Sequence, residues 1–253
     1  MVGSRFEERG LPPLLYLGRT NGSPPVWLES RAPLEQRRLL RHPIYTGQGL
    51  PRGGGHPVLL VPGFLGGDGS MATLRDWLVR LGYRVEGSGL SCNIRYSEAV
   101  LETLVPRLAA LHGQHGRRVT LIGHSRGGML AKVLAHRHPD LVGRVVGLGS
   151  PFAEPFDVHP LTMAGVRVAQ AINTVYFRRG GEVERNFLLD LAAPASVPLT
   201  SIYSRSDGIV HWEACLRTDA TCLEVRGSHV GLAVNAAVYS LLAAVLAGRR
   251  PRV

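Results

Sequence analysis

The sequence has little cysteine, almost no lysine and no long apolar run. Its three cysteines show no Cys-x-x-Cys spacing, which argues against a structural zinc site. Cys215 and Cys222 lie close enough in sequence for a local disulfide, and two free thiols in a reducing cytosol fit equally well. No apolar stretch reaches the ~18 residues that cross a bilayer. The longest, residues 230–247, contains Asn235 and predicts a buried C-terminal helix.

Basic residues outnumber acidic ones by 29 to 19, a formal net charge of +10, and Lys132 is the only lysine. Such an excess of arginine is typical of a GC-rich genome, although it also suits contact with an anionic surface. The densest clusters lie in peripheral segments (residues 37–41 and 249–252) without interleaved aromatic residues. We therefore expect no nucleic-acid partner. Peripheral contact with an anionic membrane surface and the oligomeric state stay open.

The N-terminal residues are polar and lack the apolar stretch of a secretory signal, so a cytoplasmic location is favoured and the compartment left open. Residues 1–55 are rich in proline, glycine and arginine, with one helical segment at 34–40. They predict an N-terminal arm packed on the core. Residues 56–253 predict one domain.

From residue 56, apolar strand-like and amphipathic helical segments alternate, which predicts an α/β fold with a mostly parallel sheet and helices on both faces. The expected strands are residues 58–61, 83–85, 118–122, 144–148, 197–203 and 222–225. The expected helices are 71–81, 97–112 and 128–138. Residues 152–195 interrupt the alternation with helical segments at 161–176 and 186–191. They predict a small helical cap, with a crossover helix and long loops as the alternative.

The strongest motif is Gly123-His124-Ser125-Arg126-Gly127, placed between a predicted strand and a predicted helix. A serine on such a tight turn has its hydroxyl lifted clear of the sheet, and small neighbours relieve the crowding. Ser125 is therefore the predicted nucleophile. The pattern also fits a glycine-rich helix start, but its strand-turn-helix context favours a nucleophile.

A serine nucleophile needs a base, and the base needs a carboxylate that orients it. His229 follows the last predicted strand and fits the base better than the other histidines. Asp207 follows the preceding strand in Ser206-Asp207-Gly208 and is the predicted acid, with Glu213 and Asp219 as alternatives. The chain order Ser, Asp, His differs from that of the chymotrypsin and subtilisin folds.

Acyl transfer also needs hydrogen-bond donors for the developing oxyanion. The amide N–H of Arg126 is one candidate. The loop Pro62-Gly63-Phe64-Leu65-Gly66 supplies the other, from Phe64 or alternatively Leu65. We expect Leu65 and His124 to contact substrate and the Arg126 side chain to stand at the pocket mouth.

These motifs together resemble the α/β-hydrolase superfamily on its lipase and esterase side. The resemblance covers about residues 55–245. The motifs are similar to those of actinobacterial lipase-like hydrolases and of the GPI-inositol-deacylase-like branch. It implies an α/β-hydrolase fold, an acyl-enzyme mechanism and a small-molecule or lipid ester as substrate. Pro62 departs from the histidine of many esterases, and Arg126 from the usual Met or Gln.

The leading hypothesis is therefore a carboxylic ester hydrolase, an esterase or lipase that could extend to polyesters. A thioesterase, amidase or acyltransferase would use the same triad. A non-catalytic binding protein on this fold and an arginine-rich binder of anionic headgroups or nucleic acid are further alternatives. No metal is expected. No dinucleotide or phosphate loop is present, since the glycines at 63–67 lack the G-x-G-x-x-G spacing and the P-loop lysine, so no cofactor is expected.

Overall fold

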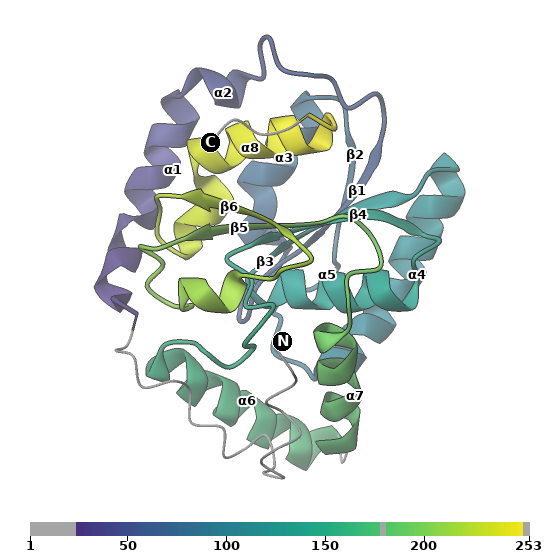
Figure 1. The fold of residues 1–253 in the computed structure, drawn as a ribbon, viewed down its shortest axis with the longest axis vertical. Coiled ribbons are helices and arrows are strands. Elements are labelled where there is room, and N and C mark those ends of the chain that lie inside the picture. The colour runs from purple at the N-terminus through teal and green to yellow at the C-terminus, as the bar shows by residue number, and fades with distance from the viewer. Residues whose placement is uncertain (1–23, 178–180, 250–253) are drawn as a thin grey trace.

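The computed structural model describes residues 24–177 and 181–249, in which six parallel strands form one sheet ordered β2-β1-β3-β4-β5-β6 (Figure 1). Their bounds are β1 Pro57–Val61, β2 Arg84–Gly87, β3 Val119–His124, β4 Val142–Leu148, β5 Leu199–Ser204 and β6 Thr221–Val225. The chain runs outward from β1 to β2 and then returns to β3 on the other side of β1. In parallel sheets, ligands bind at the carboxyl ends of the strands beside such a reversal. The loops after β1 and β3 are therefore the expected site.

The central strands are apolar throughout because both faces of the sheet are covered. Along β1, Val58 and Leu60 belong to one buried cluster, and Leu59 and Val61 belong to the other. This alternation follows from the two-residue repeat of a strand. The predicted α/β-hydrolase fold, with helices on both faces, is confirmed.

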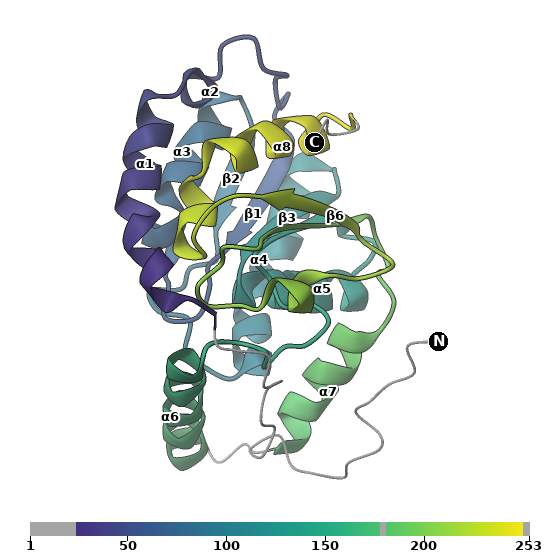
Figure 2. The same ribbon diagram turned by 60° about the vertical axis from the view of Figure 1, so that its left-hand side comes forward.

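Helices cover the two faces unequally (Figures 1 and 2). One face carries α1 (Ala32–Arg41), α2 (Pro43–Thr46), α3 (Ala72–Arg80) and α8 (Ala236–Leu246). The other carries α4 (Ser97–His115) and α5 (Arg126–Arg137). Short 3-10 helices η3 (Asp68–Met71) and η4 (Trp212–Cys215) lie in the loops after β1 and β5.

The described part of the arm is more ordered than the sequence indicates. Residues expected as loop form the 3-10 helix η2 (Val26–Arg31), which continues into α1. Leu39 of α1 is fully buried in the first cluster, and α1 packs on the segment that leads into α8. Residues 24–55 thus pack on the core, and residues 1–23 of the predicted arm lie outside the described residues.

The interruption after β4 contains α6 (Pro160–Phe177) and α7 (Gly181–Ala192), which differ in how they are held. α7 buries Phe187 and Leu191 in the second cluster. The Lys132 ammonium donates to the Leu191 and Ala193 carbonyls at 2.8 and 2.6 Å, where α7 ends. Burial, with Arg217 nearby, lowers the pKa of Lys132 to about 8.

In contrast, α6 lies over the loops that follow β1 and β2. The Asn173 side chain donates to the Ile94 carbonyl at 2.8 Å, and the Tyr96 hydroxyl bonds that of Thr174 at 2.7 Å. Leu161, Val168 and Ile172 remain exposed. A segment attached through a few loop contacts can move more easily than one embedded in a core.

The predicted C-terminal helix is interrupted at Asn235. The segment before it forms the 3-10 helix η5 (Val230–Val234). Asn235 then caps α8, since its side-chain oxygen accepts from the amides of Ala237 and Val238 at 2.8 and 3.4 Å. Asparagine competes with helical backbone bonding in this way, which explains why one continuous helix does not form.

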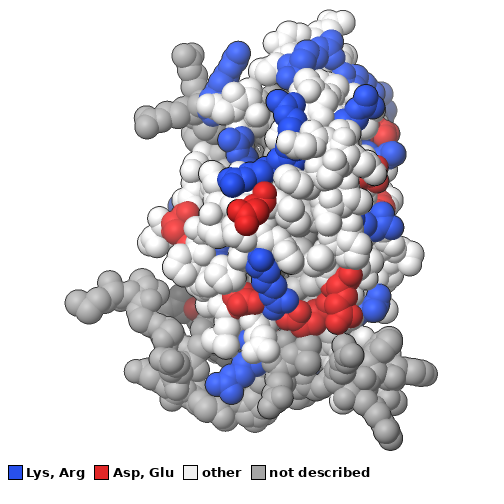
Figure 3. Space-filling view, turned by 90° about the vertical axis from the view of Figure 1, so that its right-hand side faces the viewer, with Lys and Arg blue, Asp and Glu red and all other residues white. Residues whose placement is uncertain are grey.

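Within residues 24–177 and 181–249, no helix is long and apolar enough to cross a membrane. Figure 3 shows that basic side chains on one face are divided into groups by uncharged and acidic ones. The excess of arginine is therefore not concentrated in a single patch on that face.

Candidate active site

Ser125 occupies the strained turn between β3 and α5. Its backbone angles are φ 53° and ψ −124°, a region that non-glycine residues rarely adopt. Hydrogen bonds hold the turn on both sides, from the Ser125 amide to the Leu148 carbonyl at 2.8 Å and from the Gly128 amide to the Ser125 carbonyl at 3.0 Å. Strain that the surrounding structure maintains is a feature of functional sites.

Glycine is required on both sides of this turn because backbone segments approach closely. A Cβ at Gly123 would overlap the backbone of Gly127 and Gly128. A Cβ at Gly127 would overlap the Val61 carbonyl of β1. The glycines of the Ser125 motif thus allow α5 to begin directly beside β1.

His229 and Asp207 form a buried pair at the ends of β6 and β5. The imidazole Nδ1 lies 2.6 Å from Asp207 Oδ2, and the residues are only 3% and 4% exposed. Asp207 Oδ1 accepts from the amides of Ile209 and Val210 at 2.8 and 2.7 Å. The carboxylate is therefore fixed by backbone on one oxygen and presents the other to the histidine.

The pKa of His229 is raised above its usual value. Burial alone would lower it, but the Asp207 carboxylate, through its charge and its hydrogen bond, and more weakly Glu29, outweigh that effect. A carboxylate on Nδ1 favours the imidazolium and holds the ring in one orientation.

Ser125 and His229 are brought to one place without a direct hydrogen bond between them in the described chain. They are linked through His124, whose Nε2 lies 2.9 Å from the His229 carbonyl and whose ring centroid lies 4.8 Å from that of His229. Nδ1 of His229 faces Asp207, so Nε2 is the nitrogen available to a serine. Nucleophile–base bonds are often long without substrate.

His124 itself takes a different place from the substrate contact expected of it. Its side chain is partly buried against His229 and does not line the cavity described below. Burial, together with the charge of His229, lowers the pKa of His124 to about 4. A neutral ring whose Nε2–H donates to the His229 carbonyl supports the His229 loop.

The loop after β1 lies directly beside the nucleophile. A Cβ at Gly63 would stand 3.1 Å from Ser125 Cβ and from His124 Nδ1. Among the described residues, no hydrogen bond uses the amide N–H of Phe64 or of Arg126, the first residue of α5. The Leu65 amide, by contrast, donates to the Asn93 carbonyl at 3.3 Å. Phe64 thus fits an oxyanion donor better than its predicted alternative.

Asn93 organises this loop, and nothing in the sequence pointed to it. It is fully buried, and its side-chain amide donates to the Pro62 carbonyl at 2.8 Å. Its backbone amide donates to the Gly66 carbonyl at 2.8 Å. Asn93 therefore fixes the loop that carries Phe64 from two points.

The Arg126 side chain holds Asn93 in turn, and it also lines the cavity described below. Its guanidinium donates to the Asn93 carbonyl and Oδ1 at 3.1 and 2.8 Å and to the Arg95 carbonyl at 2.5 Å. The pKa of Arg126 is lowered, because the effect of burial exceeds the opposing effect of the Glu184 charge. A planar group with several donors suits such a network, and the guanidinium donates its hydrogen bonds to oxygen atoms of the protein.

We predict that Asn93→Ala lowers kcat about tenfold to hundredfold, because misplaced Phe64 weakens oxyanion binding. KM for a short ester should change little, since Asn93 does not line the cavity. Steady-state kinetics on p-nitrophenyl acetate would measure both. Ser70→Ala, in the same loop region but exposed, is the matched control. A full-activity Asn93→Ala enzyme would contradict this role.

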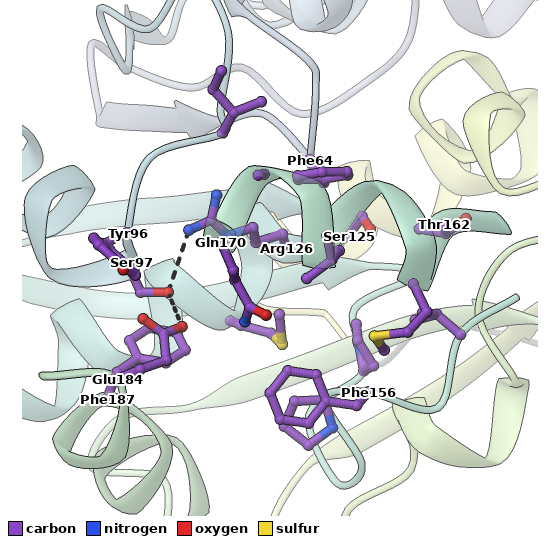
Figure 4. Close-up of a pocket in the computed structure, with 18 of the residues that line it drawn as sticks. Phe64, Tyr96, Ser97, Ser125, Arg126, Phe156, Thr162, Gln170, Glu184 and Phe187 are labelled. Atoms are coloured by element: carbon purple, nitrogen blue, oxygen red, sulfur yellow. Dashed lines mark hydrogen bonds between the residues drawn. The ribbon is translucent and has the colours of Figure 1, made fainter. Parts of the chain in front are cut away.

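A cavity opens beside Ser125 beneath α6 and α7 (Figure 4). Most of its lining is apolar, including Phe64, Met129, Phe156, Val166, Phe187 and Leu188. At one side Ser97 accepts from Arg126 at 3.3 Å and donates to Glu184 at 2.8 Å, as the dashed lines in Figure 4 show. Of the described residues that line it, Ser125 is the only member of the predicted triad.

Leu65 lies outside this cavity. It is 64% exposed and borders a second groove between the β1 loop and α6. The expected contact of Leu65 with substrate stays a prediction, and it would require a substrate that reaches that groove. The alternative acids lie elsewhere, since Glu213 is exposed and Asp219 pairs with Arg217 at 2.7 Å.

The three cysteines are free thiols, so the Cys215–Cys222 disulfide that the sequence allowed is not formed. Burial raises the pKa of the Cys215 thiol well above its usual value, which disfavours the thiolate. In the described part of the chain, no group of three His, Cys, Asp or Glu side chains is arranged to hold a metal ion.

Comparisons with solved structures identify the same architecture. Lipase BlEst2 of Bacillus licheniformis, in mature form, has a TM-score of 0.57 and 14% identity over 78% of this chain and 94% of its own. The thioesterase domain from the curacin biosynthetic pathway has 0.52 and 16% over 76% and 91%. Aspergillus fumigatus lipase B has 0.55 and 16% over 80% of this chain and 55% of its own. At such identities these likenesses show the fold.

A comparison with curated proteins finds no significant match. The family model described as "Putative esterase" matches residues 62–212, more than half of the chain. The match spans the loop after β1, Ser125 and Asp207, and it ends before His229. The chain therefore belongs to this esterase family, as a carboxylic ester hydrolase with the α/β-hydrolase fold.

Proposed function

We propose that the protein cleaves carboxylic esters through the triad Ser125–His229–Asp207 and an acyl-enzyme intermediate. The observation that carries the proposal is the buried 2.6 Å contact between His229 and Asp207, placed beside the strained Ser125 at the start of α5. Attack by a serine hydroxyl uses a base that takes its proton, and a carboxylate orients that base.

In the proposed reaction, Ser125 Oγ attacks the ester carbonyl and His229 Nε2 takes the hydroxyl proton. The amides of Phe64 and Arg126 hold the oxyanion, and the positive end of the α5 dipole adds to their effect. His229 then gives its proton to the leaving alcohol. Water, deprotonated by the same imidazole, attacks the acyl-enzyme; the bond to Ser125 Oγ breaks, the acid is released, and His229 returns the proton to Oγ.

The cavity supports an apolar acyl chain as the part of the substrate that is bound. It is lined by Met163 and Val166 of α6 and by Phe187 and Leu188 of α7. We propose that residues 152–195 act as a small cap and that residues 24–55 form the arm of one hydrolase domain. Enclosure between α6 and α7 favours a single acyl chain over a polyester strand.

The test is labelling with a fluorophosphonate and hydrolysis of p-nitrophenyl esters of increasing acyl length. We expect one label, mapped to Ser125 by peptide mass spectrometry. Specificity, measured as kcat/KM, should rise roughly threefold to fourfold per added CH₂ until the cavity is full, because each buried CH₂ contributes about 0.8 kcal/mol.

Acyl-CoA thioesters and acyl anilides in the same series separate ester hydrolysis from thioesterase and amidase chemistry. Absence of labelling, or a label on another residue, would contradict the proposed nucleophile. A flat chain-length profile would contradict the proposed acyl site.

A further inference from the structure

Glu29, in the arm outside the family match, contacts both loops that carry the proposed acid and base. Its Oε1 accepts from the Gly208 amide at 2.9 Å and from the His229 amide at 2.8 Å. Its Oε2 accepts from the Val230 amide at 2.8 Å. One carboxylate therefore joins the residue after Asp207 to the backbone of His229 itself.

A second carboxylate of the arm holds the same histidine loop. Glu35 Oε1 accepts from the Ser228 amide at 3.0 Å, and its Oε2 accepts from the Ser228 hydroxyl at 2.8 Å. A Cβ at Gly231 would overlap this carboxylate, so the glycine leaves room for it. Figure 2 shows α1 beside the segment that precedes α8.

Four of these contacts are donated by backbone amides, and the fifth is donated by the Ser228 hydroxyl. Two glutamates of the arm together accept five hydrogen bonds from the acid and base loops. Hydrogen bonds to a charged acceptor are stronger than those between neutral groups. The arm is thus built to fix the acid and base loops relative to one another.

The charges around His229 show a second effect of the arm. Asp207 faces its Nδ1, Glu29 faces its backbone, and the ring of His124 packs against its own. Glu35 accepts a hydrogen bond from Ser228, the residue before His229, and Arg31 and Arg38 lie beside Glu35 in a surface groove. Burial opposes the charged imidazole, whereas Asp207 and then Glu29 raise the pKa of His229.

We propose that Glu29 is a positioning residue for the triad, which holds the base against the acid and adds negative charge beside the imidazole. This inference rests on the proposed function. Glu29 does not line the cavity, so it acts through His229 and not on the substrate.

The test compares Glu29→Gln and Glu29→Ala with the wild-type full chain. We expect kcat to fall about tenfold to hundredfold, with KM changed less than about twofold, because the base is displaced while the acyl site is intact. The acid limb of the kcat/KM profile should move to lower pH. Removal of a negative charge lowers the pKa of the imidazole, so the ring loses its proton, and can act as a base, at lower pH.

Glu86→Gln is the matched control, since it removes the same charge from an exposed position of β2. Thermal unfolding of each variant separates misfolding from misplacement, and Glu29→Gln keeps the test available should Glu29→Ala not fold. Wild-type kinetics in both variants, or a loss with an unmoved acid limb, would overturn the proposal. An inactive wild-type enzyme would instead overturn the proposed function.

Discussion

Ser125→Ala is expected to lower kcat/KM for a p-nitrophenyl ester by about 10⁵-fold, because the acyl-enzyme route is closed. The remaining rate, above that in water, would come from the amides of Phe64 and Arg126 and from binding in the apolar cavity. KM should change little, since loss of one hydroxyl leaves the acyl site in place. Stopped assays at high enzyme concentration would measure such a residual rate.

Ser150→Ala provides the matched control. Ser150 is fully buried beside Gly128, which lies in the first turn of α5, the helix that begins after Ser125. The Ser150 hydroxyl has no hydrogen-bond partner among the described residues. Removal of an unsatisfied buried hydroxyl is not expected to destabilise the fold. Its activity should match wild type. A Ser125→Ala enzyme within tenfold of wild type would place the nucleophile elsewhere.

The sequence was sufficient for the parts of the fold and site that depend on local pattern. The turn around Ser125 is visible because a strand, a small-residue turn and a helix follow one another within about twenty residues. Asp207 and His229 follow from the order of strands, since each comes directly after one. The structure places them as a pair, and the Asp207→Asn variant would test their proposed role in catalysis.

The supporting contacts could not be predicted in the same way. Asn93 meets Arg126 across 33 positions, and Glu29 meets His229 across 200. Neither lies in a motif, and each uses backbone groups whose positions depend on the finished fold. Arg126 shows the limit most clearly, because its place in the turn was visible while the direction of its side chain was not.

Asp207→Asn is expected to lower kcat by about 10⁴-fold while the fold is kept. The reason lies in how the carboxylate is held. Oδ1 accepts from the amides of Ile209 and Val210, so the single oxygen of asparagine must take that place. The NH₂ group then faces His229 Nδ1 and donates to it. Nδ1 becomes an acceptor, the ring proton moves to Nε2, and Nε2 can no longer accept the proton of Ser125.

The same substitution moves the pH dependence in a definite direction. Asp207 is the largest contributor that raises the pKa of His229, and burial, which lowers it, remains in the variant. The imidazole therefore loses its proton at lower pH, and the acid limb of the residual activity shifts downward. A variant that lost activity only through unfolding would show no such shift in its folded fraction.

Asp219→Asn and Glu213→Gln are the controls, because both were candidate acids by sequence. Asp219 is paired with Arg217, which holds its pKa at about 2, and Glu213 lies exposed on η4. Neither touches His229, so folded enzyme of either variant should keep its kcat/KM and its acid limb. If Asp207→Asn retained activity while one of these lost it, the acid would be reassigned to that residue, because only a carboxylate on Nδ1 maintains the tautomer that lets Nε2 act as base.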